Sequence, residues 1–255
     1  MKRRQELRVI DTNPGRACSL SCAGALLLLS AGIVAQTPAP DASALEQSLT
    51  AEVERIGEAD RVMPPASCQV LFGGSSSIAN WKATLAEDMA PIPVINRGIG
   101  DAQIEFENHW FDRIVAPYRP RAIVFYAGEN DLNFGKPVQQ VIADFDAFME
   151  LKEKALGETP VYFISVKPSK KRYTQFPLQS EVNAAIRRRA AERNDLHFID
   201  VVPLMLNGGR PKDIFLPDDL HMSRAGYLLW TQAVRGALLP ITEAEARACR
   251  QGEKP

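Results

Sequence analysis

The sequence predicts an α/β protein, a three-layer α/β/α sandwich around a mostly parallel five-stranded sheet. Five short runs of apolar, β-branched or aromatic residues recur along the chain, as in strands that are buried on both faces. Amphipathic segments of helical length separate these runs, and strands that alternate with helices form a parallel sheet covered on both sides. Of the 255 residues, 45% are hydrophobic and 24% are charged, which is typical of a globular protein with a full core.

Residues 1–35 have the layout of a secretory signal peptide. The basic residues Lys2, Arg3, Arg4 and Arg8 precede an apolar run from Ala23 to Ala35, and the polar Gln36 follows. A basic start, a short apolar region and a small residue at the cleavage point define such signals, so we expect cleavage near Ala35 and a secreted or periplasmic protein. Counted back to Ala17, the run approaches the ~20 residues that span a bilayer. An uncleaved N-terminal anchor is therefore the alternative, and only then would the protein contact a membrane.

The next segment, residues 36–65, is expected to be a linker followed by a helix. A stretch containing proline and alanine comes first, and Ser43–Asp60 then has apolar residues at the three- to four-residue spacing of a helix. The remaining residues, 66–255, are expected to form one domain.

Strands and helices are expected to alternate through this domain. The expected strands are Gln69–Phe72, Val94–Ile95, Ala122–Tyr126, Val161–Val166 and Leu196–Val202. The expected helices are Ile104–Ala116, Val138–Leu156, Glu181–Arg193 and Arg224–Leu238. Parallel strands joined in this way need right-handed crossovers, which place helices on both faces of the sheet.

The net charge bears on nucleic-acid binding, and the cysteine content bears on a disulfide. The formal net charge is −1, and without residues 1–35 it becomes −4, so nothing draws the protein electrostatically to nucleic acid. Cleavage would remove two cysteines and leave Cys68 and Cys249. In an oxidising compartment we expect these two to form a disulfide, although two free thiols are the alternative.

Four loops contain the residue types that acyl chemistry needs. Three of them follow expected strands, where ligands bind in open parallel sheets. The four loops are Gly73-Gly74-Ser75-Ser76-Ser77-Ile78, Asn96-Arg97-Gly98-Ile99-Gly100-Asp101, Gly128-Glu129-Asn130-Asp131 and Asp218-Asp219-Leu220-His221. Together they supply a hydroxyl, backbone amides beside glycines, a carboxamide and an Asp/His pair, which are the parts of a serine hydrolase.

A serine hydroxyl becomes nucleophilic when an imidazole takes its proton, and a carboxylate orients that imidazole. Of the three histidines, His109 and His197 fall in an expected helix and at the start of an expected strand, so His221 is the candidate base. Asp218, three residues earlier, can reach the same imidazole within one loop and is preferred to Asp219.

These blocks resemble, in order, those of the SGNH hydrolases, also called GDSL-type esterases and lipases, and the fold would then be SGNH/flavodoxin-like. The first block has serine where the family has the aspartate of Gly-Asp-Ser, and Ser76 falls on the nucleophile. The resemblance implies ester hydrolysis through Ser76, His221 and Asp218. It also implies an oxyanion hole formed by Ser76, Gly100 and Asn130. Because Asp101 stands where the second block often has another glycine, Asp101 instead of Gly100 could supply that amide.

Other motifs do not fit. The serine loop is not the Gly-x-Ser-x-Gly elbow of α/β-hydrolases, because Ile78 occupies the second glycine position, and it lacks the Gly-Lys-Ser/Thr ending of a phosphate loop. Neither Cys-x-x-Cys nor His-Glu-x-x-His occurs. We therefore expect catalysis with no cofactor and no metal.

The substrate is less well defined. The loop Lys167–Tyr173 has four cations and an aromatic residue near the expected site, and it either binds an acidic or sugar substrate or is simply a solvated loop. Trp81 is expected to pack in the core rather than to serve as a sugar platform. No lid insertion or long lipid-binding stretch is visible, so the expected substrate is a small acyl ester, such as acetyl on a carbohydrate. An O-acyltransferase and a non-catalytic carbohydrate-binding envelope protein are the alternatives.

Overall fold

The computed structural model describes residues 42–239 of the chain. The expected signal peptide, its cleavage point and Cys249 lie outside these residues. Cys68 is disulfide-bonded, but its pairing with Cys249 stays a prediction. Among the described residues, no helix is both long and apolar enough to cross a membrane.

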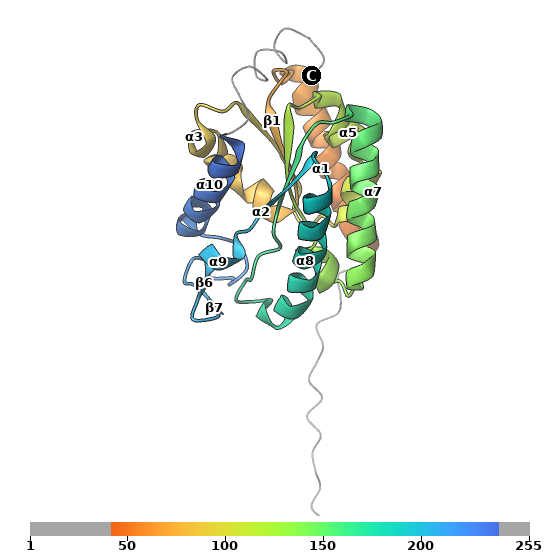
Figure 1. Ribbon diagram of the computed structural model, residues 1–255. Coiled ribbons are helices and arrows are strands. Elements are labelled where there is room, and N and C mark those ends of the chain that lie inside the picture. The colour runs from red at the N-terminus through yellow and green to blue at the C-terminus, as the bar shows by residue number, and fades with distance from the viewer. Residues whose placement is uncertain (1–41, 240–255) are drawn as a thin grey trace, which may run out of the picture. The chain divides into compact units, whose positions relative to one another are not determined.

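The centre of the fold is a five-stranded sheet in which every neighbouring pair is parallel (Figure 1). The strand order is β2-β1-β3-β4-β5. The strands are β1 (Val70–Gly74), β2 (Val94–Gly98), β3 (Ala122–Tyr126), β4 (Val161–Ile164) and β5 (Leu196–Ile199). The predicted α/β sandwich is therefore confirmed, and because the strands are parallel, all the loops that follow them lie at one end of the sheet.

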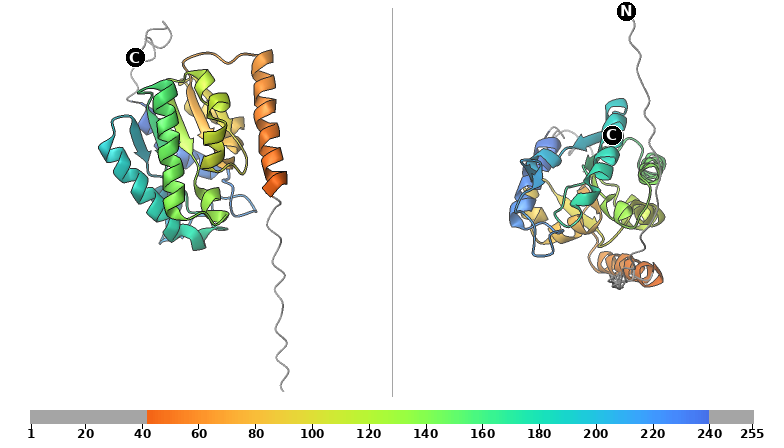
Figure 2. Two further views of the ribbon diagram at one scale, coloured as in Figure 1. Left: turned by 90° about the vertical axis from the view of Figure 1, so that its right-hand side faces the viewer. Right: turned by 90° about the horizontal axis from the view of Figure 1, so that it is seen from below.

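Helices cover both faces of the sheet (Figure 2). One face is covered by α1 (Ala42–Val62), α4 (Ile104–His109), α5 (Phe111–Ile114), α6 (Glu129–Asn133), α7 (Val138–Leu156) and α8 (Phe176–Glu192). The other is covered by α2 (Ser76–Ala79), α3 (Leu85–Met89), α9 (Val202–Met205) and α10 (Arg224–Leu238). Short elements complete the fold: the 3₁₀ helices η1 (Asn80–Ala83), η2 (Ala116–Tyr118) and η3 (Tyr173–Gln175), and the hairpin of β6 (Leu206–Asn207) and β7 (Arg210–Pro211).

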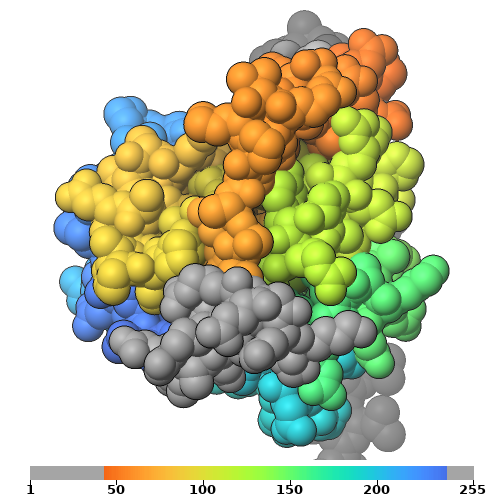
Figure 3. All heavy atoms as spheres, turned by 90° about the horizontal axis from the view of Figure 1, so that it is seen from above, coloured from red at the N-terminus to blue at the C-terminus, as the bar shows by residue number. Residues whose placement is uncertain are grey.

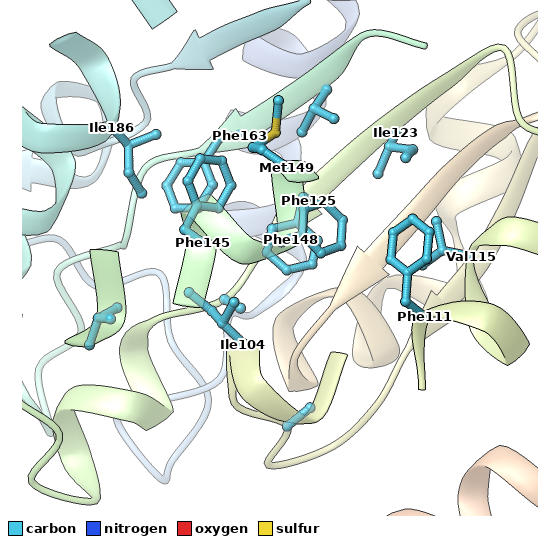
Figure 4. Close-up of a cluster of buried hydrophobic side chains, with 14 of the residues drawn as sticks. Ile104, Phe111, Val115, Ile123, Phe125, Phe145, Phe148, Met149, Phe163 and Ile186 are labelled. Atoms are coloured by element: carbon cyan, nitrogen blue, oxygen red, sulfur yellow. The ribbon is translucent and has the colours of Figure 1, made fainter. Parts of the chain in front are cut away.

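Successive residues of the central strands point into two separate cores. On the α7 face, five buried phenylalanines pack together, and the rings of Phe125 and Phe148 stack with centroids 4.2 Å apart (Figure 4). On the α10 face, Trp81 is fully buried and contacts Tyr227 and Trp230. Trp81 is thus a core residue, as expected. Figure 3 shows the end of the molecule where the strands begin, crossed by the segment that connects α1 to β1.

The structure differs from the expected elements in several respects. The edge strands β2 and β5 are not buried on both faces, because each has a neighbouring strand on one side only and is less covered by helices. The expected helix Ile104–Ala116 is interrupted at Trp110 and gives way to η2, where Pro117 cannot continue a helical hydrogen-bond ladder. Helix α8 begins earlier than expected, at Phe176, with a proline in its first turn, where proline is tolerated.

Candidate active site

A tight turn between β1 and α2 positions Ser76. Gly74 has a φ of +112°, and a Cβ at this position would lie 2.0 Å from the carbonyl oxygen of Tyr126. Only glycine fits so close to the neighbouring strand. The next amide, that of Ser75, donates to the same Tyr126 carbonyl at 2.8 Å. The chain then enters α2 with Ser76 as its first residue, so the backbone amide of Ser76 has no acceptor within the helix.

The carboxyl end of β2 packs against α2 and supports it. Gly98 approaches this helix so closely that a Cβ would lie 2.4 Å from the backbone nitrogen of Ala79. Asn96 lies between them: its Nδ2 donates to the Ile78 carbonyl at 2.7 Å, and its Oδ1 accepts from the Gly98 amide at 3.0 Å. The asparagine and glycine of this block therefore hold the helix that begins at Ser76, a role that the sequence did not assign to them.

Ser76, His221 and Asp218 form a continuous hydrogen-bonded chain. The Nε2 atom of His221 lies 3.2 Å from Ser76 Oγ, and its Nδ1 atom lies 2.6 Å from Asp218 Oδ2. The other oxygen of Asp218 accepts the backbone amides of Leu220 at 3.0 Å and His221 at 2.9 Å. Burial alone would raise the pKa of Asp218, but these hydrogen bonds outweigh it and lower the pKa to about 2. The carboxylate therefore stays ionised and favours the imidazole tautomer with its proton on Nδ1.

Asp219 does not compete for the imidazole. It has a φ of +57°, and its side chain lies 3.8 Å from Lys170 instead. The choice of Asp218 made from the spacing is thus the one that the geometry favours.

Asn130 lies in α6, directly after β3. Its side chain is almost fully buried, and its Nδ2 donates to the carbonyl of Ala102 at 3.0 Å. Gly100 and Asp101 lie in the turn after β2, and the amide of Ile99 fastens this turn to the Gly74 carbonyl at 2.8 Å. The choice between Gly100 and Asp101 as the oxyanion amide stays a prediction.

A cluster of buried charges surrounds Asn130. The carboxylate of Glu129 accepts from Tyr126 Oη at 2.8 Å, from Ser169 Oγ at 3.0 Å and from the ammonium of Lys167. Glu129 and Lys167 are each at least 95% buried. Burial on its own would raise the pKa of Glu129, but the charges of Lys167 and Arg172 outweigh it and lower the pKa. Glu129 is therefore a buried carboxylate.

A second buried carboxyl group lies near the end of β1. Glu107 is fully buried, and neither of its carboxyl oxygens has a hydrogen-bond partner among the described residues. Burial raises its pKa well above the usual value, and the charge of Asp131 adds to this effect. Burial therefore favours the neutral, protonated form of this carboxyl group.

The segment after α2 is fixed to α10 through Asp88. Its buried carboxylate accepts from Trp81 Nε1 at 2.7 Å, from Thr84 Oγ1 at 2.8 Å, and from both terminal nitrogens of Arg224 at 2.5 and 2.6 Å. Because Arg224 is the first residue of α10 and follows His221 closely, this contact ties the serine segment to the histidine loop.

Residues 48–229 match the GDSL-like lipase/acylhydrolase family. The chain belongs to this family. It is an SGNH-type hydrolase of acyl esters, as the four sequence blocks predicted. No curated protein matches it significantly.

Solved structures share the fold of this GDSL-like hydrolase. A Streptococcus pneumonia protein named after platelet activating factor has a TM-score of 0.65 at 21% identity, over 77% of this chain and 97% of that chain. A GDSL-like lipase from Bacteroides thetaiotaomicron has a TM-score of 0.63 at 18% identity, over 74% of this chain and 98% of that chain. A carbohydrate esterase of family 3 from Talaromyces cellulolyticus has a TM-score of 0.57 at 13% identity, over 70% of this chain and 99% of that chain. At these identities the similarity shows a common fold.

The four cations of the basic loop of this GDSL-like hydrolase have different surroundings. Lys167 is buried against Glu129, and Lys170 pairs with Asp213. Of the four loop cations, only Lys171 is exposed and has no charged partner among the described residues. A buried carboxylate such as that of Glu129 needs a nearby cation to stay charged, and Lys167 supplies it.

No group of three or more His, Cys, Asp or Glu side chains within residues 42–239 could hold a metal ion.

Proposed function

We propose that this GDSL-like hydrolase is a serine esterase that removes small acyl groups, acetyl foremost, from carbohydrate esters through an acyl-enzyme. The observation behind the proposal is that His221 bridges the hydroxyl of Ser76 and the carboxylate of Asp218. Each ring nitrogen thus has the partner that nucleophilic catalysis requires.

In the first half-reaction, Ser76 Oγ attacks the ester carbonyl carbon while its proton moves to His221 Nε2. The tetrahedral intermediate collapses as the C–O bond to the alcohol breaks, and His221 returns the proton to the leaving alkoxide. Asp218 remains ionised and stabilises the imidazolium during this step. In the second half-reaction a water molecule attacks the acyl-enzyme by the same path, which releases the carboxylic acid and restores Ser76.

The negative charge of each tetrahedral intermediate needs preorganised donors. We assign these to the backbone amide of Ser76, the backbone amide of Gly100 or Asp101, and Nδ2 of Asn130. In other serine hydrolases, the loss of one such donor lowers kcat by a factor of about 10²–10³.

Two observations favour a small acyl group on a sugar. The loops that follow β1, β2 and β3 are short, with five residues or fewer before the next helix. Among the structures that share the fold are the family 3 carbohydrate esterase and an acetyl esterase, the latter with a TM-score of 0.55 at 14% identity.

The test is hydrolysis of p-nitrophenyl esters of increasing chain length, and release of acetate from acetylated oligosaccharides, by the wild type and Ser76→Ala. Ser77→Ala is the matched control, because it removes a hydroxyl one residue away. We expect turnover and fluorophosphonate labelling of Ser76 in the wild type and the control but not in Ser76→Ala. Preference for long chains would refute the acetyl assignment, and transfer of the acyl group to an added alcohol in place of water would identify an acyltransferase.

We also propose that the protein acts outside the cytoplasm, after cleavage near Ala35. The proposal depends on the N-terminal sequence alone. Intact mass and N-terminal sequencing of protein recovered from the periplasm or medium would test it, and an unprocessed N-terminus in a membrane fraction would instead indicate an anchor.

A further inference from the structure

Asn130 makes a hydrogen bond at each end of its carboxamide. Its Nδ2 donates to the Ala102 carbonyl at 3.0 Å, and its Oδ1 accepts from Arg172 Nη1 at 2.9 Å. A guanidinium only donates hydrogen bonds, and a carbonyl only accepts them. A carboxamide turned over by 180° would therefore face donor with donor on one side and acceptor with acceptor on the other.

This arrangement leaves one N–H of Asn130 for an acyl oxygen. The NH₂ group has two hydrogens, and the Ala102 carbonyl takes one of them. The contact with Arg172 also polarises the amide, because a hydrogen bond from a cation to the carbonyl oxygen draws electron density away from the nitrogen. The remaining N–H becomes a stronger donor, and its direction is fixed before the substrate arrives.

Arg172 is itself held by the buried cluster. Its guanidinium lies 3.9 Å from Glu129 Oε1, and its backbone amide donates to Ser169 Oγ at 3.3 Å. Ser169 in turn donates to the same oxygen of Glu129. The side chain of Arg172 is only 11% exposed, which suits an internal support better than a clamp that reaches into solvent for a substrate.

We propose that Arg172 is a positioning residue of the oxyanion hole, which acts through Asn130 by fixing and polarising its carboxamide, with the Glu129 carboxylate holding Arg172 in place. The proposal deepens the proposed function and rests on it, since it needs Asn130 to stabilise the tetrahedral intermediate. It also explains why a charged cluster is buried beside a neutral asparagine.

The test is a double-mutant cycle with Arg172→Met and Asn130→Ala, measured with a fluorogenic acetate ester above the background of Ser76→Ala. Methionine keeps much of the arginine stem and removes every donor. We expect Arg172→Met alone to lower kcat about 10–100-fold with little change in KM, a fraction of the loss expected for a whole oxyanion donor. In the Asn130→Ala background the same substitution should change kcat less than threefold, because its target is gone.

The matched control is Lys171→Met, the same type of change on the exposed neighbour in the same loop, which should keep wild-type kcat. Inhibition by phenylboronic acid, which forms an anionic tetrahedral adduct with an active serine, should weaken in Arg172→Met by about the same factor as kcat. Thermal unfolding shows whether each variant is folded. If Arg172→Met does not fold, Arg172→Lys is used in the cycle, and its loss should be smaller and likewise vanish in the Asn130→Ala background.

Equal losses from the Arg172 substitution in both backgrounds would overturn the proposal, and so would a loss confined to KM, which would indicate direct contact with the substrate. Unchanged boronate inhibition would overturn it as well. If instead the proposed function is wrong, the wild type will be no more active than Ser76→Ala, an outcome that differs from each of those above.

Discussion

Replacing Gly98 with alanine tests whether the second loop sets the position of Ser76. The new Cβ would lie 2.4 Å from the Ala79 nitrogen and 2.7 Å from the Ile78 Cβ. Both neighbours belong to α2, whose first residue is Ser76, and backbone cannot swing aside as the end of a side chain can. To reach even 3.0 Å the helix and β2 must separate by about 0.6 Å, and ordinary contact needs about 1 Å.

This shift predicts two effects of different size. Overpacking of this kind costs about 1–3 kcal/mol of stability, which for a domain of this length lowers the Tm by about 2–10 °C. A displacement of about 1 Å at a reacting atom costs about 10²-fold in rate, and the 3.2 Å between Ser76 Oγ and His221 Nε2 leaves little room for it. We therefore expect kcat/KM for p-nitrophenyl acetate to fall about 30–100-fold.

The control is Gly236→Ala in α10, where a Cβ meets nothing within 4 Å. Alanine in a helix interior is more favourable than glycine by about 0.5–1 kcal/mol, so this variant should be slightly more stable and fully active. If Gly98→Ala keeps its activity within threefold and its Tm within 1 °C of the wild type, the close approach of β2 to α2 does not position the serine.

Three further substitutions give separate outcomes. Asp218→Asn should lower kcat about 10⁴-fold by favouring the wrong tautomer of His221, and a loss below tenfold in steady-state assays would contradict that role. Folding raises the pKa of the buried Glu107 carboxyl above its ordinary value of about 4.5. The wild type therefore loses stability as the pH rises above that value, whereas Glu107→Gln has no group to titrate there. The Tm advantage of Glu107→Gln should thus grow between pH 4.5 and 8, and a constant difference would refute this. Asp88→Ala leaves buried donors unpaired and should cost about 2–3 kcal/mol in urea unfolding, whereas the exposed neighbour Glu87→Ala should cost almost nothing.

The residues of the candidate site could be predicted because each lies in a short sequence block that can be recognised without knowledge of distant contacts. Asp218 and His221 are three residues apart, and Ser76 follows a strand that its own apolar residues define. Asn130 is recognised in the same way, from the block after β3. The fold class followed from the same alternation of strands and helices.

What could not be predicted depends on contacts between distant segments. Arg172 reaches Asn130 across 42 positions of sequence, and no spacing rule connects the loop after β4 to the helix after β3. Lys167 looked like one of four solvated cations because lysine is rarely buried without a partner, and that partner, Glu129, is visible only in three dimensions. The helices α2, α3, α6 and α9 have four or five residues each, too few for a helical period to show.

The contact between Ser76 and His221 joins residues 145 positions apart, and this has a consequence for the order in which the protein matures. On the α10 face, the core around Trp81 is closed by Tyr227, Trp230, Val234 and Leu238 of the last helix. A chain that emerges from its N-terminus therefore presents Ser76 well before its base exists, and one apolar face of the sheet stays only partly covered until α10 docks. Hydrolytic competence and protection of that face arise in the same final step, so the appearance of esterase activity reports completed folding of the whole domain.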